Sequence, residues 1–101
     1  MKATIIEESI WDNKNIPGAI KYWTQKDKPD EIHGFNFTCP CGCGRIGSVR
    51  FAFSRSPSGW TWNSNHKAPT VSPSINLQAD DGNGSLVSHW HGWLVDGMWK
   101  P

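Results

Sequence analysis

The 101-residue sequence contains no long apolar run and no excess of charge. No stretch approaches the roughly 20 apolar residues of a membrane-spanning helix, which excludes an integral membrane protein of that kind. The formal net charge is +1, so there is no electrostatic case for binding nucleic acid or a membrane surface. The first residues turn acidic at Glu7-Glu8, unlike a secretory signal, and we therefore expect a cytoplasmic protein.

Cysteine is scarce: there are three, and all of them lie between positions 39 and 43. An odd number of cysteines in a protein that is not exported favours reduced thiols over a disulfide framework. The chain has no C-x-x-C pair, no H-E-x-x-H motif and no paired glutamate near its histidines. These absences disfavour a zinc hydrolase of the usual kind.

The chain also lacks any convincing run at the helical period, any internal repeat and any low-complexity tract. Apolar residues instead alternate in short segments between turn residues, which is typical of β-strands. The predicted fold is mainly β: one small domain over residues 16–101, built as a twisted sheet or half-barrel, after a variable lead-in over residues 1–15. We expect strands at 19–23, 32–38, 46–53, 60–62, 70–77 and 85–94, and a last one beginning at Trp99.

Three connections carry their own predictions. The run 26–31 is rich in Lys, Asp and Glu and is expected to be a solvated loop. Pro73 places an edge or a bulge within the 70–77 strand, because proline cannot donate to a strand ladder. Asp96-Gly97 is a type I′ hairpin signal.

Three cysteines lie at the tip of the hairpin predicted from the 32–38 and 46–53 strands. Cys39, Cys41 and Cys43 alternate with Pro40, Gly42 and Gly44. Both glycines can adopt positive φ, so the three sulfurs can converge. Thiolates are strong zinc ligands, and such a density of reduced cysteine favours a metal over buried or reactive thiols. The sequence therefore predicts Zn²⁺ bound at a hairpin tip, by two or by all three cysteines.

A histidine from the late Ser88-His89-Trp90-His91 segment is the expected fourth ligand. His89 and His91 point to the same side if this segment is regularly extended, so either one is a candidate. His33 and His66 are weaker candidates. Three cysteines with one histidine make a closed, structural site, whereas three protein ligands leave a position that can activate water.

Tryptophan is the strongest compositional oddity, with seven residues in this short chain. Most of them are expected to fill the core, since indole has a large apolar surface. The functional alternative is an aromatic groove for a protein tail or a small ligand. Its lining would be Trp60, Trp62, Trp90 and Trp93.

Four sequence motifs follow one another in a familiar order. They are 39–44 (Cys-Pro-Cys-Gly-Cys-Gly), 60–63 (Trp-Thr-Trp-Asn), 69–75 (Pro-Thr-Val-Ser-Pro-Ser-Ile), and His91 with Asp96-Gly97 downstream. From about Ile16 onward this order resembles a widespread family of small bacterial and phage zinc-binding proteins of unknown function. Some phage members carry the label "ammonia monooxygenase", which is unsupported here because the chain has no recognisable copper or di-iron ligand set. Other members lie beside bacterial ubiquitin-like conjugation genes.

The resemblance implies a peptidase. Members beside ubiquitin-like genes look like processing or deconjugating proteases, which makes Ser74 the expected nucleophile, His91 its base and Asp96 the group that orients the imidazole. This chemistry requires the hydroxyl of Ser74 or Ser72 within hydrogen-bond reach of His91. Many members have a cysteine just before the histidine that aligns with His91, and His89 is expected to replace it as the fourth zinc ligand.

Three functions remain open at this point. The first is a zinc-stapled serine hydrolase that cleaves peptide or isopeptide bonds in ubiquitin-like or other protein tails. The second is a non-catalytic zinc module that binds a protein partner through its tryptophans. The third, by analogy alone, is a phage counter-defence protein that binds a host factor. The sequence does not determine the oligomeric state.

Overall fold

The computed structural model describes residues 1–7, 16–53 and 57–101, and over these residues it contains strands and no helix. The first sheet has the order β1 (Thr4–Ile5), β2 (Ala19–Gln25), β3 (Lys28–Thr38) and β4 (Ile46–Arg50). The second has the order β5 (Thr61–Trp62), β6 (Val71–Asp80), β7 (Leu86–Val95) and β8 (Met98–Lys100). This confirms the predicted mainly β fold. No described helix is long and apolar enough to cross a membrane.

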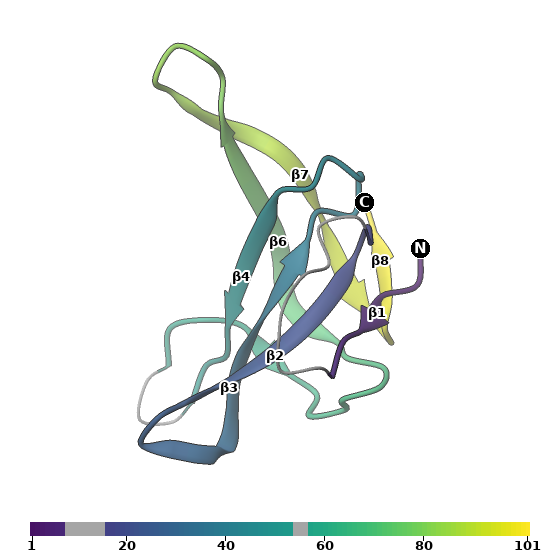
Figure 1. Cartoon of the computed structure of the whole chain (residues 1–101), viewed down its shortest axis with the longest axis vertical. Helices are drawn as coiled ribbons and strands as arrows, with labels where there is room; N and C mark the ends of the chain where they lie inside the picture. The colour runs from purple at the N-terminus through teal and green to yellow at the C-terminus, as the bar shows by residue number, and fades with distance from the viewer. Residues whose placement is uncertain (8–15, 54–56) are drawn as a thin grey trace.

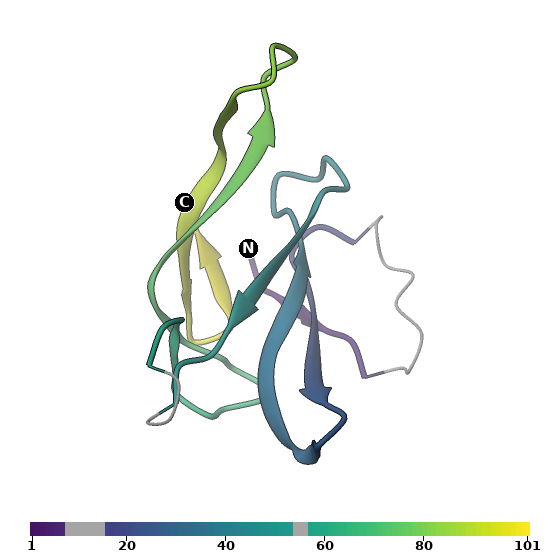
Figure 2. The same ribbon diagram turned by 90° about the vertical axis from the view of Figure 1, so that its left-hand side faces the viewer.

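The two sheets face each other (Figures 1 and 2), and in the described part of the chain two backbone bridges join them. Lys2 bridges to Met98 of β8, while β1 pairs with β2 in parallel, so the N-terminal residues link one sheet to the other. Phe51, just after β4, forms a parallel bridge with Trp60, just before β5. Over the residues described, each sheet otherwise remains open and neither closes into a barrel.

The core lies between the sheets because alternate residues of each strand point inward. Its largest side chain is Trp99 on β8, which is only 2% exposed and whose Nε1 donates a hydrogen bond of 2.9 Å to the Gly18 carbonyl. The rest of the core is apolar and comes from both sheets and from Ala3: Ile20, Phe35, Phe37, Val49, Phe51, Val71, Ile75 and Leu94. Tryptophan thus fills the core as predicted at Trp99.

Three local predictions have clear outcomes. The 26–31 run is not a loop: β3 begins at Lys28 and Gln25 pairs with it, so only a two-residue turn separates β2 from β3. A register shift between Val71 and Ile75 confirms the bulge expected around Pro73. Asp96 and Gly97 have φ of 50° and 73°, as a type I′ turn requires.

Candidate functional site

The β3–β4 hairpin ends in a tight tip that gathers the three cysteines. The Cys39 amide donates to the Arg45 carbonyl at 2.8 Å, and the Gly42 amide donates to the Cys39 carbonyl at 3.1 Å. Gly42 and Gly44 have φ of 88° and 85°, the left-handed conformation predicted for them. The chain therefore curls tightly enough to bring alternate side chains together.

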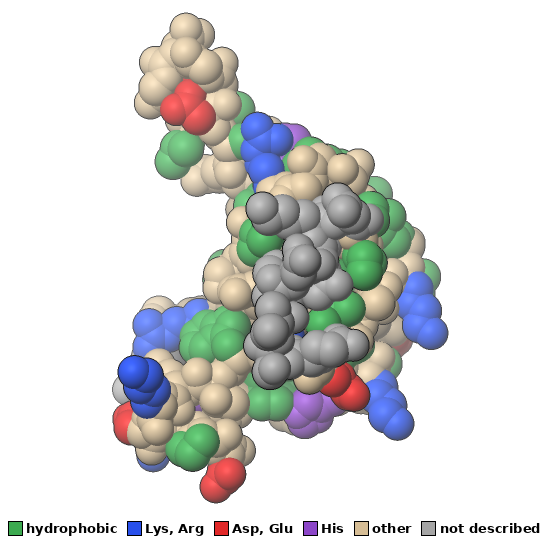
Figure 3. All heavy atoms as spheres, in the orientation of Figure 1, with side chains coloured by type: hydrophobic (Ala, Val, Ile, Leu, Met, Phe, Trp, Pro, Cys, Tyr) green, Lys and Arg blue, Asp and Glu red, His purple; other side chains and the backbone are tan. Residues whose placement is uncertain are grey.

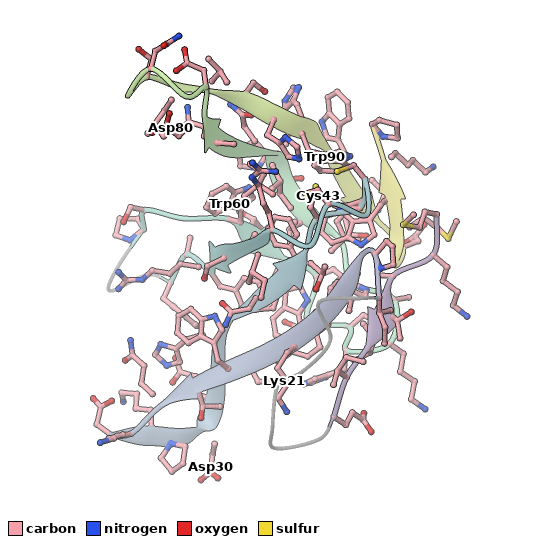
Figure 4. All side chains as sticks on the ribbon, turned by 45° about the horizontal axis from the view of Figure 1, so that its top comes forward. Lys21, Asp30, Cys43, Trp60, Asp80 and Trp90 are labelled. Carbon is pink, nitrogen blue, oxygen red and sulfur yellow. The ribbon has the colours of Figure 1, made fainter. Side chains whose placement is uncertain are left out.

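His89 reaches this tip from the second sheet because β7 is bulged there. Leu77 pairs with Trp90 whereas Gln78 pairs with Ser88, so β7 has one extra residue, His89, at this point. A bulge re-aims the side chain of the extra residue. The Nε2 of His89 consequently lies 3.3 Å from the Cys41 sulfur and 3.1 Å from the Cys43 sulfur. Figure 4 shows Cys43 near Trp90, the residue that follows His89.

Cys39, Cys41, Cys43 and His89, here termed the Cys3His cluster, have the geometry of a metal site. One ligand atom from each residue lies within 4.8 Å of the other three. Zinc bound by thiolates at about 2.3 Å in a tetrahedron has ligand atoms about 3.8 Å apart. The distances within the cluster bracket that value, and three sulfurs with one imidazole nitrogen are donors typical of zinc. The cluster can thus hold a metal ion.

The environments of the thiols at the two ends of the cluster differ sharply. Cys39 is fully buried, and burial raises the pKa of its thiol to about 12. Desolvation also acts to raise the pKa of the Cys43 thiol, but hydrogen bonds from Arg45, Cys41 and His89 outweigh it and lower this pKa to about 6. Cys43 is therefore the thiolate to which a metal would first be attracted.

A second site lies on the outer face of the β5–β8 sheet. Ser74 on β6 and His91 on β7, here termed the Ser–His pair, approach to 2.9 Å between the Ser74 Oγ and the His91 Nε2. Their strand neighbours Ile75 and Gly92 are buried, so the pair points away from the core. A hydroxyl at this distance from an imidazole nitrogen can transfer its proton to that nitrogen.

Asp96 is not close to the Ser–His pair. It lies in the turn after β7, five residues beyond His91, which corresponds to roughly 15 Å of extended strand. Its backbone amide donates to the Thr70 hydroxyl at 2.8 Å, and that hydroxyl contacts the Asp96 carboxylate at 3.5 Å. The structure thus gives Asp96 a place in the turn and brings no described carboxylate to His91.

Asn76 is a neighbour of the pair that the sequence did not single out. It lies two residues after Ser74 on the same outer face, and its Cα is paired with that of His91. The Ser88 hydroxyl donates a hydrogen bond of 2.7 Å to its Oδ1. That bond orients the amide and leaves the two hydrogens of Nδ2 as donors. Strand alternation alone puts Asn76 on the face of Ser74, whereas its place opposite His91 depends on cross-strand register, which no local motif reveals.

The four tryptophans proposed for a groove do not line one surface. Trp90 packs edge-on against buried Trp99, with ring centroids 5.5 Å apart. Trp62 stacks on Phe51 at 4.5 Å, and Trp60 donates through Nε1 to the Ser74 carbonyl at 3.2 Å. Trp93 is 44% exposed and lies beside the His91 ring on the outer face.

The two remaining histidines lie away from both sites. His33 is buried with its ring 5.0 Å from that of Phe53, and its Nε2 is 3.4 Å from a Glu31 carboxylate oxygen. His66 packs edge-on against Tyr22 and Trp62. Neither is among the residues of the Cys3His cluster.

Comparison with known proteins identifies a family. The family described as bacterial ubiquitination-like system serine protease (BubE) matches residues 8–101. No curated protein and no solved structure matches the chain. The match covers nearly the whole sequence, including the Cys3His cluster and the Ser–His pair. The chain therefore belongs to the BubE family of serine proteases from bacterial ubiquitination-like systems.

Proposed function

We propose that this protein is a zinc-stapled serine peptidase or isopeptidase that cleaves at the tail of a ubiquitin-like or similar protein. The observation that carries this proposal is the 2.9 Å approach of the Ser74 Oγ to the His91 Nε2. It supplies the nucleophile–base contact that acyl transfer needs, on two adjacent strands rather than on loops. The family description supports the same reaction class.

The proposed reaction begins with the Ser–His pair. The Ser74 Oγ attacks the substrate carbonyl carbon as its proton passes to the His91 Nε2, which forms a new O–C bond and a tetrahedral oxyanion. The oxyanion then collapses, the C–N bond breaks and His91 returns the proton to the leaving amine. Water, deprotonated by His91, hydrolyses the acyl ester and restores Ser74.

Asn76 is the proposed stabiliser of the oxyanion. Its Oδ1 is held by Ser88, which lies farther from Ser74 along the sheet, so the Nδ2 side of the amide turns toward the nucleophile. A donor fixed before the reaction stabilises developing charge without reorganising. No described residue hydrogen bonds to Nδ1 of His91, so the proposed machinery is a dyad with an amide donor.

The Cys3His cluster has a structural role in this proposal. Its residues would hold Zn²⁺, and four protein ligands leave no open position at which water could be activated. Cys39, Cys41 and Cys43 belong to the first sheet's hairpin, whereas His89 belongs to the second sheet. The cluster therefore ties the two sheets together and holds the bulge that precedes His91.

The proposed substrate is a protein tail, because the Ser–His pair is on an open sheet face. His91 is exposed and Ser74 is half-buried, so an accessible, extended segment can reach them. A cytoplasmic ubiquitin-like protein would present such a tail, either as a precursor or joined to a target.

Labelling with a fluorophosphonate probe tests the nucleophile directly. We expect covalent modification of Ser74, mapped by mass spectrometry, and loss of labelling in Ser74→Ala. Ser72→Ala is the matched control, because Ser72 is an exposed serine on the same strand that pairs with Thr61. A folded, zinc-loaded protein whose Ser74 is never labelled would contradict the proposal.

One observation favours binding without catalysis as a second candidate function. A cleft of about 490 Å³ between the sheets is lined by aromatic residues and two acidic ones, among them Phe53, Trp62, Asp30 and Glu31. Apolar walls with a few charges are typical of ligand sites. Quenching of tryptophan fluorescence by a tail peptide, with no turnover, would favour this alternative.

A further inference from the structure

The second sheet is open along most of one edge of β6. β6 runs from Val71 to Asp80, but its outer neighbour β5 pairs with it only at Val71 and Ser72. From residue 74 to residue 80 no described strand is paired with that side of β6. We refer to this stretch as the open edge of β6.

One contact shows which backbone N–H and C=O groups of β6 face the open edge. Trp60, which comes from the β5 side, donates its indole N–H to the Ser74 carbonyl at 3.2 Å, so this carbonyl points away from β7. In a strand the N–H and C=O of alternate residues point to the same side. The backbone groups of Asn76 and Gln78 therefore also face the open edge.

The other sheet also presents a strand edge nearby. β4 is the last strand of the first sheet along Ile46–Arg50, and Figure 2 shows it facing β6, where the Leu77 side chain of β6 lies against Gly47 of β4. Figure 3 shows the surface hollowed on its left side, below the projecting β6–β7 hairpin. Native proteins usually protect a long strand edge with charges, and the open edge of β6 carries one, Asp80 at its far end, and none over residues 74–79.

We propose that the substrate tail binds as an added β-strand along the open edge of β6. This inference rests on the proposed function and names the way in which the substrate is recognised. A strand added here lies about 4.8 Å from β6 and hydrogen bonds to its backbone rather than to side chains. The end of the paired tail then reaches the Ser74 hydroxyl from the open edge, while His91 lies on the β7 side of that hydroxyl.

Two features limit where the tail can lie. The Trp60 indole N–H already donates a hydrogen bond to the Ser74 carbonyl. A tail therefore cannot pair with β6 toward the β5 end, and its pairing begins after Ser74 in the direction of Asp80. Asn76, next along the edge, offers its Nδ2 to the carbonyl under attack. The tail is thus recognised by its extended backbone, which requires a segment without folded structure near the scissile bond.

Backbone methylation of a peptide tests this mode of binding. The probe is a fluorescein-labelled peptide carrying the last ten residues of a ubiquitin-like protein encoded beside a family member, titrated by anisotropy against Ser74→Ala protein. Each amide nitrogen is methylated in turn. Strand addition predicts that methylation weakens binding at least tenfold at every second position and less than twofold at the positions between. Equal tolerance at all positions, or no binding of the unmethylated peptide at millimolar concentration, overturns the proposal.

A variant of the edge gives an independent readout. Gln78→Pro removes an N–H that faces the open edge, whereas Gln78→Ala keeps it. We expect Gln78→Pro to lower kcat/KM for the peptide at least tenfold, while Gln78→Ala and the fluorophosphonate labelling rate of both variants stay within threefold of the parent. Equal cleavage by both variants, with labelling intact, overturns strand addition alone. Absence of labelling at Ser74 in the parent protein overturns the proposed catalysis instead.

Discussion

His89 and His91 lie two residues apart on β7, yet their imidazoles reach different sites on opposite faces of the sheet. The Nε2 of His89 lies 3.1 Å from the Cys43 sulfur, and the Nε2 of His91 lies 2.9 Å from the Ser74 hydroxyl. In a regular strand both side chains would share a face. The bulge at His89 separates them, so β7 contributes both a residue of the metal cluster and the proposed base.

Substitution of the two histidines should therefore abolish different properties of the protein. His91→Ala is expected to keep one zinc per chain but to lose fluorophosphonate labelling, because the Ser74 hydroxyl no longer has a base. His89→Ala is expected to lose zinc, because only three thiols remain. Zinc content by atomic emission and labelling by mass spectrometry measure both properties on the same sample. Loss of zinc in both variants would contradict the separation of the two sites.

Removal of the metal should lower both the thermal stability of the fold and the fluorophosphonate labelling of Ser74. Zinc at about 1,000 times its dissociation constant stabilises a protein by about 4 kcal/mol, which corresponds to about 16–32 °C in a domain of this size. We expect a strong chelator to lower Tm by such an amount in calorimetry, and labelling of Ser74 to fall with it. Readdition of Zn²⁺ is the control. Because the ligands must lose protons to bind Zn²⁺, the affinity for zinc should decline as the pH falls. An unchanged Tm in the chelator would refute the metal staple.

The strand positions were predictable because alternation is a local property. Trp60-Thr61-Trp62 and the segment before the cysteines alternate visibly, and the structure has β5 and β3 there. The cysteine tip was equally predictable, since its glycines and thiols are contiguous. The loop prediction for the 26–31 run is wrong because charge indicates only exposure, and an exposed hairpin end is as charged as a loop.

The features that could not be predicted from the sequence are those that depend on pairing between strands. The bulge at His89 arises from the register of β6 against β7, which no window of residues contains. Analogy with catalytic triads predicts Asp96 beside His91, whereas the intervening strand places Asp96 in the turn beside Thr70. The open edge of β6 exists because β5 is short, and that mismatch appears only when the two strands are paired.

The cysteines should differ in reactivity once the metal is removed. At pH 7 the Cys43 thiol, with its pKa lowered to about 6, is mostly thiolate, whereas buried Cys39, with its pKa raised to about 12, is a neutral thiol. Iodoacetamide should therefore modify Cys43 well before Cys39 in metal-free protein. Because the thiolate is the nucleophile, the Cys43 rate should fall as the pH falls through about 6. Peptide mapping against time and pH measures both effects, and faster alkylation of Cys39 would contradict them.

Replacing the Asp96 carboxylate should hardly affect activity. Asn also adopts positive φ readily and can accept the Thr70 hydrogen bond, so Asp96→Asn preserves the turn. In a Ser-His-Asp triad the same change lowers kcat by about 10⁴. We expect kcat for the tail peptide to stay within about threefold of the parent, with Tm unchanged in calorimetry. A loss of several hundredfold with the fold intact would restore Asp96 to the catalytic machinery.

Asn76 should matter to the rate and little to substrate affinity, because the proposed oxyanion exists only after attack. Removing one oxyanion donor typically costs about 10²–10³ in kcat. We expect Asn76→Ala to lower kcat for the tail peptide by that factor while KM changes less than about threefold, as measured in steady-state assays. Ser88→Ala keeps the amide but frees its orientation, so its kcat should fall by a smaller factor. Asn76→Asp, similar in size but without the donor, should be at least as poor as Asn76→Ala. If Asn76→Asp retained full kcat, the amide hydrogens would have no part in the reaction, and the oxyanion would have to be stabilised by backbone amides alone.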